Sequence, residues 1–244
     1  MNILAFDVET KPATVYTWNL HQPIIGIDQI IDPGGMICFA AKWVGRPGIE
    51  FRSDHHDGHE TMIQRIWQLL DQCDAVLYFN GDRFDKPVVQ REFIERGMTP
   101  PSPYKTIDLY KTVRRQGRFI SNKLAHIAPQ LGLQGKLSHE GFSLWKKCLA
   151  GDEAAWAKMR RYNKRDVTLL EDAYQKLLPW ITNHPSRAAQ QGANICGKCG
   201  SHDFESRGYA LLRTGSYRRY RCNQCGSWHR STKRETTTNI VEAA

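Results

Sequence analysis

The chain begins with an apolar segment that leads directly into two acidic residues. Residues 2–10 read Asn-Ile-Leu-Ala-Phe-Asp-Val-Glu-Thr, which is typical of a buried β-strand. Because residues two apart in a strand point to the same face, Asp7 and Glu9 are expected to project together from its end. Two neighbouring carboxylates repel each other unless a cation or hydrogen-bond donors offset their charge. A hard cation such as Mg²⁺ suits these oxygen ligands. Taken alone, the two acidic residues could equally well cap a turn instead of binding a metal ion.

The composition is that of a globular protein with an excess of basic residues. The 244 residues are 41% hydrophobic and 24% charged, which allows one domain with a proper core and a small appendage. The formal net charge of +9 indicates a polyanionic partner, nucleic acid first, although a basic protein need not bind anything specific.

Neither a membrane span nor a signal peptide is visible in the sequence. No apolar run approaches the roughly 20 residues that a membrane-spanning helix needs, and the N-terminus lacks a basic region before an apolar one. We therefore expect a cytoplasmic, intracellular protein with no membrane contact and with reduced cysteines. A chain with so few domains would suit a phage or bacterial protein.

Predicted strands and helices alternate along the first 182 residues. We expect strands at residues 36–44, 49–53 and 75–79, and helices at 60–73, 86–96, 106–115, 121–131, 140–149 and 153–178. Residues 11–35 are expected to form a long loop over the site. His55 and His56 are expected in a solvated loop, and a metal-binding pair is the less favoured alternative. The order predicts an α/β fold, a mixed sheet flanked by helices.

Two further motifs follow the first strand. Asn80, Phe84 and Asp85 come after the predicted strand at 75–79, and Asp85 is expected to cap the next helix. Tyr162 and Asp166 are spaced i, i+4 in the long helix, so they share one face. Taken alone, that last pair reads as a core tyrosine beside a surface aspartate.

In this order, the three motifs resemble those of the DEDD superfamily of 3′–5′ exonucleases, which has a ribonuclease H-like fold. Phe6 to Thr10 is similar to the first motif of that family, Asn80 to Asp85 to the second, and Tyr162 to Asp166 to the third. The tyrosine places the resemblance with the DEDDy branch, and it covers about residues 1–180. Lys11-Pro12 departs from the small residue that often continues the first motif, which leaves substrate contacts there in doubt.

The resemblance implies a metal-dependent 3′–5′ exonuclease. Its substrate would be single-stranded DNA, or the 3′ ends of duplex DNA, hydrolysed by a two-metal mechanism. Four carboxylates would hold two Mg²⁺ or Mn²⁺ ions: Asp7, Glu9, Asp85 and Asp166. Tyr162 would orient the attacking water, because a phenol with a pKa of about 10 is a poor general base at neutral pH. Thr10, Asn80 and Phe84 would contact the nucleic acid.

The sequence leaves several alternatives open. The same site would suit an exoribonuclease or a structure-specific endonuclease, and a non-catalytic nucleic-acid-binding protein could keep the fold. DNA is favoured over RNA, and a proofreading role would require a separate polymerase or another replication or repair protein as partner. Asp82 competes with Asp85 as the ligand of the second motif. Asp108 is favoured as a helix cap over a residue of the site.

Two Cys-x-x-Cys pairs near the C-terminus predict a second, smaller domain. The thiolates of Cys196, Cys199, Cys222 and Cys225 suit one structural Zn²⁺. So short a segment lacks the core to fold alone, so the metal should supply its stability. We expect a linker at 183–194, a zinc ribbon at 195–235 and a disordered tail at 236–244. Cys38, Cys73 and Cys148 are expected to be ordinary buried residues.

The predicted zinc ribbon is basic and aromatic. Residues 207–234 contain no acidic residue, and tyrosines and a tryptophan are interleaved with the arginines. Cations suit phosphates and aromatic rings suit bases, which predicts a nucleic-acid surface. We expect contacts from Arg213, Arg218, Arg219, Arg221 and Trp228. A solvated basic face and a protein-docking ribbon are the alternatives.

Overall fold

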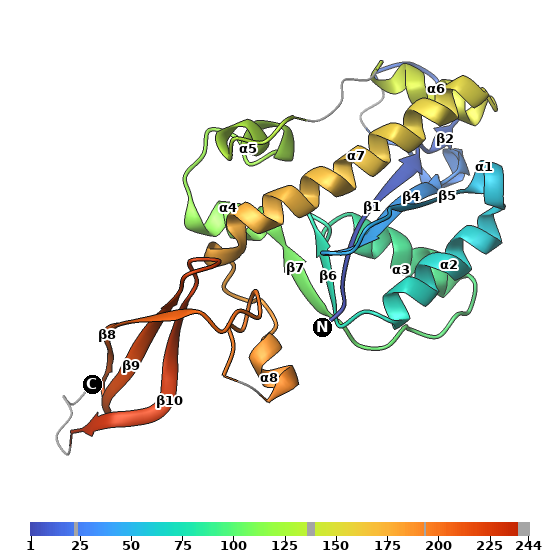
Figure 1. The fold of residues 1–244 in the computed structure, drawn as a ribbon. Helices are drawn as coiled ribbons and strands as arrows, with labels where there is room; N and C mark the ends of the chain where they lie inside the picture. Colours follow the sequence, from blue (N-terminus) through green and yellow to red (C-terminus); the bar gives the residue numbers. More distant parts are fainter. Residues whose placement is uncertain (22–23, 136–139, 193, 239–244) are drawn as a thin grey trace. The chain divides into compact units, whose positions relative to one another are not determined.

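The computed structural model describes residues 1–21, 24–135, 140–192 and 194–238 (Figure 1). The chain divides into two units, residues 2–173 and residues 174–244 together with Met1, and each is described by itself. The division falls inside the long helix of the third motif, before the predicted domain end at residue 182. Among the described residues, no helix combines the length and the apolar character needed to cross a membrane.

In the described part of the first unit, a five-stranded mixed sheet has the strand order β5-β4-β1-β6-β7. Strand β1 (Ile3–Lys11) lies at the centre, antiparallel to β4 (Gly35–Trp43) and parallel to β6 (Ala75–Tyr78). The edge strands are β5 (Glu50–Ser53), antiparallel to β4, and β7 (Lys105–Asp108), parallel to β6. The predicted mixed α/β sheet is therefore confirmed.

Strand β7 corrects the prediction of a helix over residues 106–115. Thr106 pairs with Val76 and Asp108 with Tyr78, and helix α4 (Leu109–Gln116) begins directly after the strand. A four-residue strand is too short to show a clear alternation, and its pairing with β6 is not visible locally. The first three residues of the predicted helix are therefore strand.

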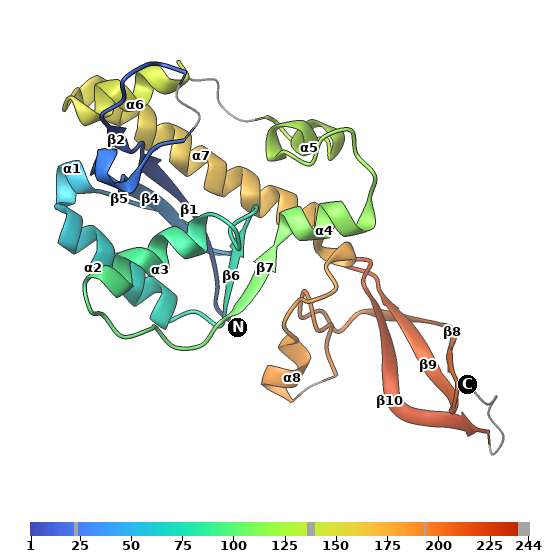
Figure 2. The ribbon, with the colours of Figure 1, turned by 180° about the vertical axis from the view of Figure 1, so that it is seen from behind.

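Helices cover both faces of this sheet (Figures 1 and 2). Helices α2 (His59–Asp71) and α3 (Asp85–Glu95) pack against alternate residues of β1, namely Leu4, Phe6 and Val8. The opposite face is covered by α6 (Phe142–Leu149) and α7 (Glu153–Leu177). Because side chains alternate along a strand, Asp7 and Glu9 project toward the side of α7.

Shorter elements complete the first unit. The predicted loop 11–35 contains a small hairpin, β2 (Thr14–Val15) with β3 (Ile30–Asp32), and a 3₁₀ turn, η1 (Ile27–Gln29). The expected loop around the two histidines is a short helix, α1 (Asp54–Asp57), capped by the hydroxyl of Ser53. Ser121 is the predicted cap of the next helix, but the N-cap of helix α5 (Leu124–Gln130) is Lys123.

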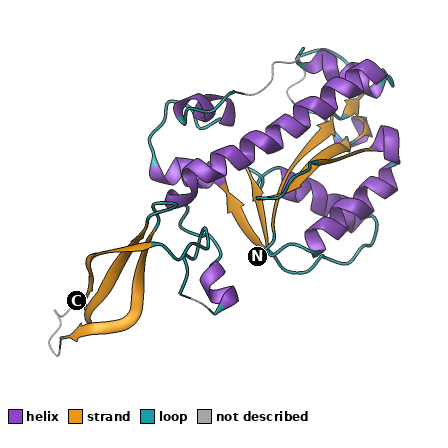
Figure 3. Ribbon diagram, viewed as in Figure 1, coloured by secondary structure: helices purple, strands orange, loops and turns teal. Residues whose placement is uncertain are grey.

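The second unit holds a three-stranded antiparallel sheet in the order β10-β9-β8 (Figure 3). Its strands are β8 (Phe204–Leu212), β9 (Gly215–Cys222) and β10 (Trp228–Thr237). A 3₁₀ turn, η2 (Leu178–Trp180), follows α7.

Two predictions for the second unit are corrected by its elements. Helix α8 (Arg187–Gln191) lies inside the predicted linker 183–194. Strand β10 runs to Thr237, so the first two residues of the predicted disordered tail are strand. Residues 239–244 of that tail lie outside the described residues.

Candidate active site

Three carboxylates from β1 and α7 converge in the first unit. Asp7, Glu9 and Asp166 each offer an oxygen, and these oxygens lie within 4.8 Å of one another. The alternation of β1 presents the first two toward α7, and the 3.6-residue period of α7 buries Asp166, which is 3% exposed. We call these three residues the acidic cluster.

Among the described residues, Asp85 stands outside the acidic cluster but is tied to the same strand. It is the first residue of α3, not its N-cap, and it is 4% exposed. Its Oδ1 accepts a hydrogen bond of 3.1 Å from the backbone N of Val8, between the two acidic residues of β1. Asp82, the competing residue, instead accepts a hydrogen bond of 2.6 Å from Tyr78 Oη and pairs with Lys111.

Tyr162 lies one helical turn before Asp166 and faces the same side of α7. Its ring packs edge-on against Trp145, with ring centroids 6.3 Å apart. Burial, followed by the negative charges of the acidic cluster, raises the pKa of Tyr162 well above its ordinary value. The phenol therefore keeps its proton and can act as a hydrogen-bond donor.

Asn163 is a residue of the site that the sequence analysis misses. It is fully buried, and its Nδ2 donates hydrogen bonds to Asp7 Oδ2 at 2.7 Å and to the Asp7 backbone oxygen at 3.2 Å. Its Oδ1 is buried and has no hydrogen-bond partner in the part of the chain that the structure describes. The sequence does contain a signal for Asn163: an amide side chain three residues before Asp166 lies on the same face of the helix.

The loop of the second motif is held by Asp108. Asn80 has φ of 67°, the one non-glycine residue with positive φ in the described ranges. Asp108 Oδ1 accepts hydrogen bonds from Asn80 N at 2.8 Å and from Tyr110 N at 3.0 Å. Asp108 therefore caps α4, as favoured, and also fixes the loop. A Cβ at Gly81 would lie 2.2 Å from the Tyr78 ring, so the loop requires glycine there.

A pocket of about 340 Å³ opens beside the acidic cluster. Its lining combines site residues with aromatic and amide side chains: Asp7, Phe79, Asn80, Tyr110, Asn122, Lys123, Leu124, Ala125, Asp166 and Leu170. Of the three predicted nucleic-acid contacts in this unit, Asn80 lines the pocket. Thr10 and Phe84 are not among the described residues that line it, and Phe84 is 45% exposed.

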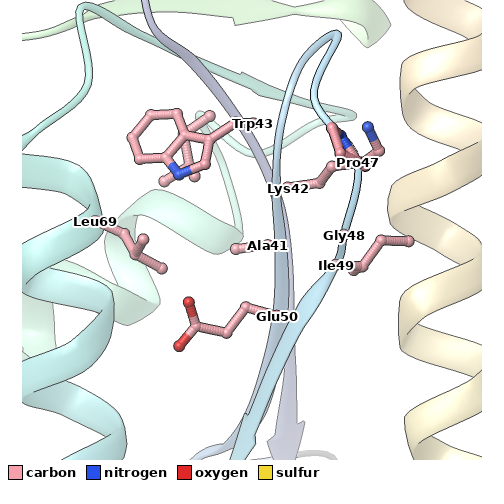
Figure 4. A pocket seen from close by; sticks show the side chains of 9 residues that line it. Ala41, Lys42, Trp43, Pro47, Gly48, Ile49, Glu50 and Leu69 are labelled. Atoms are coloured by element: carbon pink, nitrogen blue, oxygen red, sulfur yellow. The ribbon is translucent and has the colours of Figure 1, made fainter.

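A second pocket, also of about 340 Å³, lies at the hairpin of β4 and β5 (Figure 4). Among the described residues that line it, none belongs to the acidic cluster. Its carboxylate, Glu50, accepts hydrogen bonds of 2.8 Å from Arg65 Nε and Nη2 and one of 3.0 Å from Arg52 Nε. This pocket is therefore a poor candidate for the site.

The four cysteines of the second unit meet as the spacing predicts. A sulfur of each lies within 4.8 Å of the others, and Cys196–Cys225 and Cys199–Cys222 are each 3.6 Å apart. Although burial raises it, hydrogen bonding to Ser227 and to the other cysteines lowers the pKa of Cys225 to about 7. Burial instead raises the pKa of Cys196 and of Cys199, so the support for a metal site comes from the positions of the four sulfurs.

Both cysteine turns close in the same way. In each, the N of the first cysteine donates to the carbonyl five residues on, with distances of 2.8 Å to Ser201 and 2.9 Å to Ser227. The glycine after the second cysteine donates back to the first cysteine at 2.9 Å, and Gly200 and Gly226 both have positive φ. Two matching turns that present four sulfurs to one point fit a tetrahedral metal ion such as Zn²⁺.

Arginine and aromatic side chains pair on the sheet of the second unit. Arg219 lies over the ring of Trp228 at 4.9 Å, and Arg230 over that of Tyr217 at 4.6 Å. The alternation of β9 places Arg219 and Arg221 on one face and Arg218 on the other, where Arg218 lies over Tyr209 at 4.5 Å. Arg213 is exposed in the turn between β8 and β9. The predicted contact residues therefore divide between two faces.

Comparison with known proteins identifies a family, and 90 chains of solved structures match this one. The model of the RNase_H superfamily matches residues 32–178, a stretch that begins after β1 and includes Asp85, Tyr162 and Asp166. The structure of the family B DNA polymerase from the hyperthermophilic archaeon Pyrobaculum calidifontis is similar, with a TM-score of 0.55 and 17% identity. The similarity covers 73% of this chain and 24% of the polymerase, and at that identity it shows the fold alone. No curated protein matches the chain. Since the family model covers more than half of its residues, the chain belongs to the RNase_H superfamily.

Proposed function

We propose that this protein is a metal-dependent 3′–5′ exonuclease that removes nucleotides from the ends of single-stranded DNA. The observation that carries the proposal is the convergence of Asp7, Glu9 and Asp166 beside a pocket in a chain of the RNase_H superfamily. The exonuclease activity and its direction rest on the order of the three motifs. A pocket of about 340 Å³ lies in the size range of ligand pockets and would accept one terminal nucleotide.

The residues of the acidic cluster fit divalent cations. They form an all-oxygen donor set, and Asn163 adds a buried oxygen that has no hydrogen-bond partner in the described ranges. Asp7, Glu9 and Asp166 would hold Mg²⁺ or Mn²⁺, with Asp85 at the edge of the set. When bound, such ions lower the pKa of a water and stabilise the negative charge that develops on the leaving oxygen.

The protein itself would contribute orientation and proton donation. Asn163 would orient Asp7 by donating one hydrogen bond to its carboxylate and one to its backbone oxygen. Tyr162 remains protonated because its pKa is raised, so it would orient the attacking water or a phosphate oxygen as a donor and would not act as a base. Asn80, held by Asp108, would contact the nucleotide in the pocket.

The second unit would bind the rest of the nucleic acid strand. Zn²⁺ on the four cysteines would stabilise its two turns, and the face with Arg219, Trp228 and Tyr217 would offer cations for phosphates and rings for bases. The predicted protein partner is a separate polymerase or another replication or repair protein.

The test is cleavage of 5′-labelled single-stranded DNA and matching RNA with Mg²⁺ or Mn²⁺. We expect a ladder that shortens from the 3′ end, lost with EDTA and in Asp7→Asn and Asp166→Asn. Asp82→Asn is the matched control, because Asp82 lies outside the acidic cluster and should leave the rate near that of the wild type.

Other outcomes would name other functions. Faster cleavage of RNA would make the protein an exoribonuclease. Cleavage of a circular single strand, which has no 3′ end, would make it an endonuclease. Binding without cleavage of any substrate would contradict the proposal and leave a nucleic-acid-binding protein.

A further inference from the structure

Two imidazoles and a carboxylate meet at a second place in the first unit. His55 and His56 belong to α1, and Glu153 is the first residue of α7, 98 and 97 residues away along the chain. Each offers one ligand atom, and these atoms lie within 4.8 Å of one another. The adjacent histidines alone favoured a solvated loop, and only the fold adds the carboxylate.

Both ring nitrogens converge on the same carboxylate. His55 Nε2 lies 2.8 Å from Glu153 Oε1, and His56 Nε2 lies 3.2 Å from Glu153 Oε2. The two rings are perpendicular to each other, with centroids 4.8 Å apart. One point between the three side chains can therefore be reached by two nitrogens and an oxygen.

Packing beneath the cluster holds both rings in place. His56 Nδ1 lies 2.8 Å from the hydroxyl of Ser53, which is fully buried. The ring of His55 stacks on that of the buried Trp156, at 5.3 Å and an interplanar angle of 8°. A hydrogen bond on the second ring nitrogen and a fixed ring plane are the features that orient histidine ligands in metal sites.

The open side of the cluster faces solvent. Side-chain exposures are 29% for His55, 30% for His56 and 72% for Glu153. Three protein ligands with a solvent-facing side match sites in which water completes the coordination.

We propose that His55, His56 and Glu153 bind one transition-metal dication, of the class of Zn²⁺ or Ni²⁺. Imidazole ligands favour such ions over Mg²⁺, so this site and the acidic cluster would select different metals. With the ion bound, each imidazole presents its Nε2 lone pair and carries its single ring proton on Nδ1; in His56 that Nδ1–H donates to Ser53 Oγ. The ion would then join α1 to the first turn of α7, independently of the proposed nuclease activity.

Nickel binding to the full chain tests the proposal. The protein is first loaded with Zn²⁺ at its cysteines and kept in excess Mg²⁺, and bound Ni²⁺ is measured by equilibrium dialysis and calorimetry. We expect the wild type to bind one Ni²⁺ more than the double variant His55→Ala/His56→Ala. Glu153→Gln should bind at least about tenfold more weakly. His21→Ala, which removes an exposed histidine elsewhere, is the matched control and should bind as the wild type does.

Hydrogen exchange gives a second readout that random surface binding would not produce. Ni²⁺ should slow exchange of the amides of α1 in the wild type and in His21→Ala, and should leave them unchanged in the double variant. Equal stoichiometry and affinity in the wild type and a folded double variant would overturn the proposal. Should the double variant fail to fold, equal affinity in Glu153→Gln, whose changed side chain is exposed, would overturn it as well.

Discussion

Asn163 shows how one buried amide can set the geometry of a charged site. Its Nδ2 donates one hydrogen bond to the Asp7 carboxylate and one to the Asp7 backbone oxygen, so it holds the carboxylate in one orientation relative to β1. Residues that orient metal ligands typically contribute 10–100-fold to affinity or activity, although they do not touch the ion. The acidic cluster therefore depends on a fourth residue that carries no charge.

We predict that Asn163→Ala lowers the cleavage rate about 10–100-fold and raises the Mn²⁺ concentration needed for half-maximal rate. The cause is the lost orientation of Asp7, so excess Mn²⁺ should restore part of the rate. Steady-state kinetics against metal concentration measure this. Gln175→Ala, exposed on the same helix, is the control. A rate loss with an unchanged metal requirement would contradict the explanation.

At the scale of elements, the junction of β7 and α4 supports the second motif. Asp108 ends the strand, caps the helix and binds the backbone of Asn80 in another loop. One buried carboxylate therefore links an edge strand, a helix terminus and a residue that lines the pocket.

We predict that Asp108→Ala lowers the free energy of unfolding of the first unit by about 2–3 kcal/mol. It removes a helix cap and leaves the half-buried N–H of Asn80 without its acceptor. Urea unfolding followed by circular dichroism measures the change. Glu95→Ala, on the exposed side of α3, should stay within about 0.5 kcal/mol. A shift of Asp108→Ala within that same range would show that the hydrogen bonds are replaced by water.

The junction of α7 and α8 holds a histidine that is kept neutral. His184 Nδ1 donates to the Pro185 carbonyl at 2.7 Å, so its Nε2 must accept from Tyr174 Oη at 2.7 Å. Burial lowers the pKa of His184 to about 4. In the unfolded chain the ring takes up a proton at about pH 6.5, so the unfolded state binds more protons between these values.

We therefore predict that the second unit loses up to about 3 kcal/mol of stability as the pH falls from about 6.5 to about 4. The contribution of His184 is complete above that window. Nuclear magnetic resonance should show the ring of His184 titrating with a midpoint of about 4. His184→Asn should show a shallower pH dependence of stability than the wild type. A midpoint close to 6.5 would contradict the buried, neutral ring.

The sequence predicts those features whose pattern lies within one short segment of the chain. The alternation around Asp7 and Glu9, the i, i+4 spacing of Tyr162 and Asp166, and the cysteine spacing are local, and all of these residues meet as expected. The pairing of β7 with β6 and the approach of Glu153 to α1 connect distant segments, so no local pattern marks them. The role of Asp85 as a fourth metal ligand stays a prediction: its oxygens are not part of the acidic cluster, and its hydrogen bond from Val8 N joins α3 to β1, which no local pattern marks.

At the scale of the whole molecule, the two units gain their stability from different sources. The described residues of the first bury strands and helices in apolar clusters on either side of its sheet. In the second, the strands are largely exposed, and the best buried residues near them include Cys196, Cys222 and Ser227. A sheet with so little apolar burial needs another source of stability, which the cysteines would supply through Zn²⁺.

We predict that removing Zn²⁺ unfolds the sheet of the second unit and leaves the first unit folded. A zinc-selective chelator in excess Mg²⁺ should speed amide exchange throughout β8, β9 and β10, with no change in β1, β4 and β6. Exchange followed by mass spectrometry resolves the two sets of peptides. Added Zn²⁺ should reverse the effect, and slow exchange in β9 without metal would show that the sheet folds unaided.

Helix α7 also restricts how this protein can change during evolution. The same helix carries Tyr162, Asn163 and Asp166 of the candidate site and the buried core residues Trp156, Met159 and Val167. Each residue turns the helix by about 100°, so one inserted or deleted residue would rotate everything beyond it away from its partners. Natural variants of this segment should therefore differ by substitution and not by length, whereas exposed loops outside the second motif and the cysteine turns can lengthen at a small entropic cost.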